Sequence, residues 1–162
     1  MLLTDIQNDL LNRILDEYAQ NIIDESLQHQ QSIESVNFLL KNLAFLLFDH
    51  RRILESAVDI LDESEQFIHH YGTTSLPQRH FWTVKGSQGN EYICLQNFCP
   101  CPYFLQHARM RPGRTFCKHL LAIRIYSAMY KDNIIILSDE QFALVMCGEE
   151  RPPTTNNILF HN

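Results

Sequence analysis

The feature that most constrains this chain is a set of four metal-ligating side chains arranged as two pairs. Cys99 and Cys101 form the first pair in "CPCP", and Cys117 and His119 form the second pair in "CKH". Each cysteine of the first pair precedes a proline, which pushes it toward extended geometry. Side chains two residues apart in an extended chain point the same way, so both thiols can converge on one zinc ion.

The second pair needs a different local structure, because side chains two residues apart inside a helix point to different sides. We therefore predict that Cys117 lies just before a helix and that His119 lies in its first turn. Fifteen residues separate the two pairs, enough for a short helix at "YFLQHA" and a turn at "RPGR". The pattern predicts a structural Cys3His zinc site, and four protein ligands leave no position for an activated water, which argues against an enzyme.

Other uses of the cysteines fit less well. A disulfide between Cys117 and Cys99 or Cys101 needs an oxidising compartment, whereas the five cysteines are an odd number and the N-terminus lacks the basic flank of a signal peptide. An iron–sulfur cluster usually takes four thiolates, and the histidine disfavours it. Cys94 fits a strand position in the core, with a fifth metal ligand as the alternative, and Cys147 is expected in the core of the last helix.

The first predicted helix, over residues 2 to 27, has a long apolar stripe. Six residues at steps of three or four form it: Leu3, Ile6, Leu10, Ile14, Tyr18 and Ile22. This stripe is longer than the core of a small domain is expected to cover, so we hypothesise that part of it binds a partner. The alternative is that it packs entirely on the second helix.

The remaining patterns predict an α+β fold with N-terminal helices, a small antiparallel β-meander that carries the zinc-bound finger, and C-terminal helices. Ser138 and Gln141 match a capping box at the start of the last helix. The predicted elements after the first helix are a buried helix from Ser32, a helix over 51 to 63, strands at "QFIHHY", "RHFWTVKG" and "NEYICLQN", a helix at "FCKHLLAIRIYSAMY" and a helix from Ser138 to about Gly148. We divide the chain into a helical region (1–64), a zinc-finger module (65–148) and a mobile tail (149–162).

Charge is distributed unevenly along this chain of net charge −6. Residues 1 to 70 hold four basic and thirteen acidic side chains, whereas residues 71 to 131 hold eight basic and one acidic. No apolar run approaches the ~20 residues of a membrane helix, so we expect a soluble protein without membrane contact. The basic side chains near the zinc pattern are candidate contacts for nucleic acid or a partner, and their alternative role is to neutralise the zinc site and the acidic half. They are Arg109, Arg111, Arg114 and Lys118.

The spacing of the four ligands resembles that of the SWIM-type zinc finger, and the similarity continues around it. "FWTV", "EYICL", "CPC" and "CKHLLA" follow in the order of a SWIM meander, cysteine pair and ligand-bearing helix. Members of the family in the Shu complex share an alanine three residues after the histidine, which Ala122 matches here. The resemblance is specific from about residue 66 to 147 and extends to the "LSDEQ" helix.

This resemblance implies a nuclear role in homologous recombination and DNA repair. Shu-type SWIM proteins pair with a small RecA-like recombinase paralogue and support recombinase filaments on single-stranded DNA. None of the five glycines of this chain belongs to a phosphate-binding loop, so any handling of ATP is expected to lie with the partner. The alternatives are a zinc finger that binds nucleic acid directly and a SWIM adaptor in ubiquitin ligation.

Overall fold

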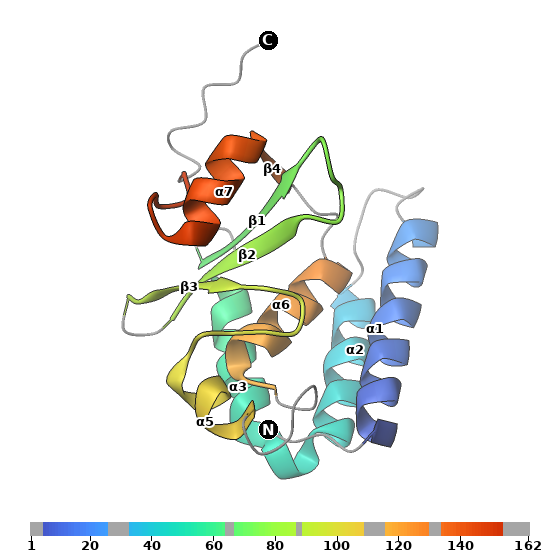
Figure 1. Cartoon of the computed structure of the whole chain (residues 1–162). Helices are drawn as coiled ribbons and strands as arrows, with labels where there is room; N and C mark the ends of the chain where they lie inside the picture. The colour runs from blue at the N-terminus through green and yellow to red at the C-terminus, as the bar shows by residue number, and fades with distance from the viewer. Residues whose placement is uncertain are drawn as a thin grey trace.

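The computed structural model describes residues 5–25, 33–63, 67–86, 89–108, 116–129 and 134–153 (Figure 1). The helices are α1 (Asp5–Glu25), α2 (Ile33–Leu46), the 3-10 turn η2 (Phe48–His50), α3 (Arg51–Asp62), α5 (Pro102–Ala108), α6 (Lys118–Met129) and α7 (Asp139–Cys147). The strands are β1 (Ile68–Thr73), β2 (His80–Lys85), β3 (Glu91–Cys94) and β4 (Ile134–Leu137). The predicted α+β class is confirmed.

The four strands form one mixed sheet in the order β3-β2-β1-β4. β1, β2 and β3 pair antiparallel, as the meander predicts, with His70 opposite Trp82 and Trp82 opposite Cys94. β4 corrects the antiparallel prediction, because it pairs parallel with β1. The chain reaches β4 through α5 and α6, a crossover of the length that parallel pairing requires.

The two faces of the sheet have different partners, because successive strand residues point to opposite faces. Tyr71 and Phe81 stack at 4.8 Å on the α7 side, where they pack with Leu137 and Val145. Residues of the other face, such as Ile68 and Val84, join a larger core shared with α1, α2, α3 and α6. Figure 1 shows this arrangement, with α7 on one face and the other long helices across the sheet from it.

α7 begins and ends where local sequence predicts. The Ser138 hydroxyl accepts from the Gln141 amide at 3.1 Å and the Gln141 side chain accepts from the Ser138 amide, which confirms the capping box. Gly148 ends the helix in the left-handed conformation, with φ of 77°. Beyond it, the Tyr71 hydroxyl donates to the Pro153 carbonyl at 2.9 Å, and the rest of the predicted tail lies outside the described residues.

Cys147 is exposed in the last turn of α7, so the expectation that it is a core residue is wrong. α7 touches the molecule on one side only, and the single residue it buries fully is Val145. The last turn carries Cys147 away from that side.

α1 packs on α2 and α6, and its buried line is Leu11, Leu15 and Tyr18. Of the predicted stripe, Tyr18 is therefore enclosed by the chain's own core, Ile14 is half-buried against that core, and Leu10 is 40% exposed. Leu3 and the side chains of Ile6 and Ile22 lie outside what the structure describes. No helix among the described residues is long and apolar enough to cross a bilayer.

Arg124 of α6 links the helical region to the loop after β3. Its guanidinium donates to the Asn12 amide oxygen of α1 at 2.7 Å and to that of Asn97 at 3.1 Å. The same group lies over the Phe116 ring at 4.4 Å. Burial lowers the pKa of Arg124, and the two side-chain oxygens satisfy donors that burial removes from water.

Leu11→Ala tests which side of α1 holds the fold together. Leu11 is fully buried, so we expect its truncation to lower the free energy of unfolding by about 2 to 5 kcal/mol. Leu10→Ala is the matched control on the neighbouring, 40% exposed position, and its effect should be much smaller. Urea unfolding of both variants measures the difference, and equal losses would contradict this orientation of α1.

Ala122→Leu tests the packing of α6 one turn beyond His119. Ala122 has no exposed surface, so a larger side chain overfills the core and should lower the free energy of unfolding by about 1 to 3 kcal/mol. Ala143→Leu makes the same change at an exposed position of α7 and should be nearly neutral. An Ala122→Leu variant as stable as the control would show that the core has room at this position.

Candidate metal centre

Three local structures bring the four predicted ligands together. After β3, Leu95 and Phe98 pair through two backbone hydrogen bonds of 2.9 and 3.2 Å, and this tight turn sends the chain into the first cysteine pair. Cys101 immediately precedes α5, and Cys117 immediately precedes α6. His119 lies in the first turn of α6, as the spacing predicts.

Both helix-starting cysteines accept hydrogen bonds from the first turn that follows them. The Phe104 amide donates to the Cys101 sulfur at 3.4 Å, and the Leu120 amide donates to the Cys117 sulfur at 3.5 Å. Free amides at a helix start stabilise negative charge, so both sulfurs sit where a thiolate is favoured.

The four ligand atoms lie within 4.8 Å of one another, and all four side chains are buried. The Cys99 sulfur and the His119 Nδ1 atom are 3.7 Å apart. Two ligand atoms on a tetrahedral zinc ion, bound at roughly 2.3 Å for sulfur and roughly 2.0 Å for nitrogen, lie about that far apart. The donor set and its spacing therefore fit one zinc ion, and Nδ1 is the histidine nitrogen that faces it.

The protonation of the three thiols follows from their mutual contacts. Hydrogen bonds from Cys117 and then Cys99 lower the pKa of Cys101, whereas the bond to Cys101 is the main cause that raises the pKa of both Cys99 and Cys117. The three thiols therefore compete for protons within one buried cluster. A bound zinc ion supplies the positive charge that lets all three sulfurs be thiolates.

Sequence reasoning missed the residues that hold the histidine ring. The Tyr92 ring lies 4.7 Å from the His119 ring, centroid to centroid. On another side, a Cβ atom at Gly86 would come within 3.0 Å of the Tyr92 ring and 3.4 Å of the His119 Nε2 atom. Gly86 therefore leaves space for this contact between the two rings. In the sequence, Gly86 stands only in the hairpin segment "GSQG", which indicates a turn and not a neighbour of the histidine.

Cys94 and Lys118 lie beside the cluster without belonging to the four ligands. Cys94 is fully buried and its thiol donates to the Tyr92 carbonyl at 3.7 Å, consistent with its expected core position. Lys118 is half-buried and lines a hollow of about 360 Å³ next to Cys101 and Cys117. Arg109, Arg111 and Arg114 lie outside the described residues.

Substitution of a ligand tests the metal centre. We expect the purified wild-type chain to hold one zinc ion, and Cys99→Ser, Cys101→Ser, Cys117→Ser and His119→Ala each to lose it together with part of the fold, because metal binding and folding are coupled. Metal analysis and thermal unfolding measure both effects. Cys94→Ala is the matched control, since it removes a buried thiol outside the set and should keep the zinc at lower stability. Full zinc content in Cys117→Ser would remove that residue from the ligand set.

Comparison of the sequence with those of known proteins finds relatives in several organisms that carry the same name. The chain is 25% identical over 146 residues to the mouse protein named zinc finger SWIM domain-containing protein 7, covering 88% of this chain and 86% of the relative. It is 23% identical over 144 residues to the human protein of that name, covering 88% of this chain and 93% of the relative. It is 30% identical over 101 residues to the zebrafish protein, covering 60% of this chain and 69% of the relative.

No family model and no solved structure matches the chain. The relatives nevertheless extend over most of its length, and their SWIM zinc finger agrees with the buried Cys3His cluster. The chain therefore belongs to the family of zinc finger SWIM domain-containing protein 7.

Proposed function

We propose that this protein is a non-enzymatic, zinc-stabilised adaptor that pairs with a RecA-like recombinase paralogue in the nucleus. In homologous recombination and DNA repair, the pair promotes the assembly or stability of recombinase filaments on single-stranded DNA. The observation that carries this proposal is the closed, buried cluster of four protein ligands in a SWIM-family chain. Such a site stabilises a fold and has no open coordination position for substrate.

The adaptor needs an active partner, because this chain has no phosphate-binding glycine loop. Its glycines do not form the pattern that precedes Lys-Ser or Lys-Thr in ATP-binding loops. ATP-dependent steps of filament assembly are therefore assigned to the RecA-like partner.

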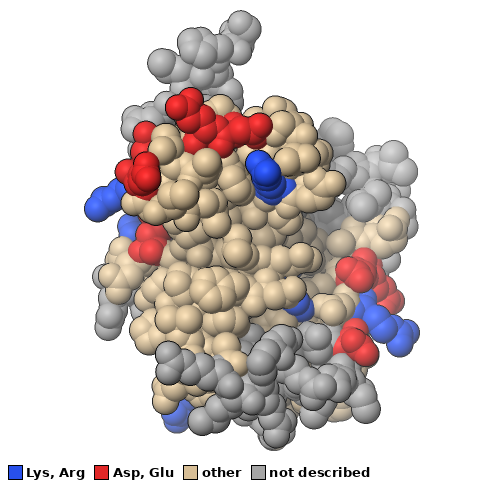
Figure 2. All heavy atoms as spheres, in the orientation of Figure 1, with Lys and Arg blue, Asp and Glu red and all other residues tan. Residues whose placement is uncertain are grey.

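Contact with single-stranded DNA is assigned to the complex rather than to this chain alone. The chain has a net charge of −6, and repulsion from phosphates opposes binding by an acidic protein. Figure 2 shows acidic side chains gathered over α7 and over α1, with few charges between them on this face. Lys118, the described member of the candidate basic set, lines the hollow next to Cys101 and Cys117. Its positive charge is therefore available to offset the negative charge of the zinc site rather than to bind phosphate.

Co-expression with the RecA-like paralogues of the same genome tests the proposal. We expect one of them to co-purify with the wild-type chain, and Cys101→Ser to abolish that recovery because it removes the zinc and the fold around it. The tight complex should bind single-stranded DNA in a salt-dependent way. If the isolated chain binds single-stranded DNA as strongly as the complex does, a zinc finger that binds nucleic acid directly is favoured instead. If a ubiquitin ligase is recovered in place of a recombinase paralogue, a SWIM adaptor in ubiquitin ligation is favoured.

A further inference from the structure

A hollow of about 790 Å³ lies between α1, α6 and the sheet. The side chains that line it come from these two helices, from β1 and β2, and from the turn after β3 (Figure 1). Polar side chains outnumber apolar ones on its walls. Its volume is in the range of roughly 300 to 1,000 Å³ that is typical of small-molecule sites. We call it the α1–α6 hollow.

Two buried donors of the α1–α6 hollow have no acceptor. Trp82 is 5% exposed, and its indole Nε1–H has no hydrogen-bond partner among the described residues. The Ser127 hydroxyl of α6 is also buried and also lacks a partner in that part of the chain. Buried polar groups in folded proteins are nearly always hydrogen-bonded, and an unpaired one is unfavourable. Both donors therefore indicate a ligand that supplies acceptors.

Arg124 adds a positive charge to the same hollow. Its guanidinium donates to the side-chain oxygens of Asn12 and Asn97, so the NH2 ends of these two amides are left as further donors. No described carboxylate forms an ion pair with Arg124. Asp16 also lines the hollow, but it is exposed and pairs with no described cation. The buried groups of the hollow thus favour an anion.

Aromatic rings of β1 and β2 also line the α1–α6 hollow. The His70 ring stacks on the Trp82 ring at 4.4 Å, and the His80 ring lies against Trp82 at 4.7 Å. The His70 Nε2 and His80 Nδ1 atoms are 3.2 Å apart, a hydrogen bond that helps to fix both imidazole planes. His80 is half-buried, so part of its ring remains available. Histidine is one of the side chains on which nucleobases stack.

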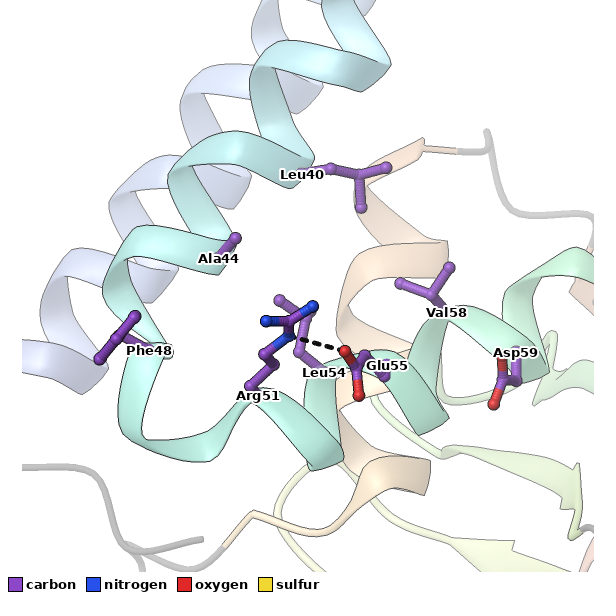
Figure 3. Close-up of a pocket in the computed structure, with 8 residues that line it drawn as sticks. All are labelled: Leu40, Ala44, Phe48, Arg51, Leu54, Glu55, Val58 and Asp59. Carbon is purple, nitrogen blue, oxygen red and sulfur yellow. Dashed lines mark hydrogen bonds and ion pairs between the residues drawn. The ribbon is translucent and has the colours of Figure 1, made fainter.

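The hollow between α2 and α3 has a different character (Figure 3). The Arg51 guanidinium and the Glu55 carboxylate at its edge form an ion pair with each other at 2.7 Å. Asp59, which also lines it, is exposed. None of the described buried donors that lack an acceptor belongs to its walls. This second hollow therefore has no unmet donor for a ligand to satisfy.

We propose that the α1–α6 hollow binds a nucleotide, with the phosphate on the donors around Arg124 and the base against the His80 ring. Phosphate oxygens accept hydrogen bonds from these donors, and their negative charge compensates the guanidinium. A carboxylate of a partner protein would meet the same donors, but an acidic side chain would leave most of the hollow empty and the rings unused.

The nucleotide has two possible sources with the same chemistry. It is either free in solution or part of a single strand, and the second source rests on the function proposed above. In that case the hollow is the place where this chain meets the strand held by the complex. Because an acidic chain repels a run of phosphates, we expect the isolated chain to bind weakly.

Fluorescence of the zinc-loaded chain tests the site directly, because Trp82 is its single tryptophan. We expect thymidine monophosphate to change the emission saturably, and thymidine, which lacks the phosphate, to bind about tenfold more weakly or worse. Ser127→Ala removes one donor and should weaken binding of thymidine monophosphate by about tenfold. Its thermal midpoint without ligand should stay unchanged, since the hydroxyl makes no described hydrogen bond.

Asp16→Asn tests the charge of the hollow in the opposite direction. It removes a carboxylate that repels phosphate, so the affinity for thymidine monophosphate should rise severalfold. Asp59→Asn is the matched control, because it makes the same change at an exposed helical position of the other hollow (Figure 3). Equal effects of the two variants would show that only net charge matters and would overturn the site.

Titration with an oligothymidine separates the two sources. Tighter binding of the oligomer assigns the nucleotide to a strand, and binding of the monophosphate that is as tight or tighter assigns it to the free pool. The site is overturned if neither probe changes the emission, if thymidine binds as tightly as its monophosphate, or if Ser127→Ala binds like the wild type. A poly-glutamate peptide that binds the hollow more tightly than either probe would also overturn it.

Recovery of the RecA-like paralogue separates this result from the proposed function. If the wild-type chain binds nucleotide but recovers no paralogue, the site is supported and the adaptor function is wrong. If it recovers the paralogue but binds neither probe, the site is wrong and the adaptor function is unaffected.

Discussion

The convergence of three sulfur atoms and one imidazole nitrogen in the interior is the constraint on which the rest of the structure depends. The ligands come from the turn after β3, the residue before α5 and the start of α6, so one ion fixes three otherwise independent segments. Without a cation, this set would bury three ionisable sulfur atoms with no compensating charge, which is unfavourable. With zinc, the same set stabilises the fold and offers no open coordination position.

The metal centre affects the whole molecule because it sits at the start of the most buried helix. α6 buries the five consecutive residues from His119 to Ile123, and α1, α3 and β2 all pack on it. Arg124 adds hydrogen bonds from α6 to α1 and to the loop that leads to the cysteines. A change at the zinc site is therefore expected to reach the N-terminal helices through α6.

The two N-terminal helices differ in how much of their apolar surface they bury. α1 covers α6 with its buried line of Leu11, Leu15 and Tyr18 and so completes the core. α2 also contributes to this core through Leu39 and Leu43, yet it holds its phenylalanines on the outside. α1 thus completes the core, whereas α2 both contributes to the core and exposes apolar surface.

The sequence by itself determined what depends on neighbouring residues. Proline after each cysteine, the position of Cys117 before a helix, the capping box at Ser138 and the hairpin around "GSQG" all follow from contacts within a few residues, and these features agree with the structure. Only the tertiary structure decided the parallel pairing of β4, the exposure of Cys147 and the contact of the Tyr92 ring with the His119 ring beside Gly86. It also decided which side of α1 is buried. Each of these features depends on contacts between segments that are far apart in the chain. A local sequence pattern does not determine which distant segment packs against it.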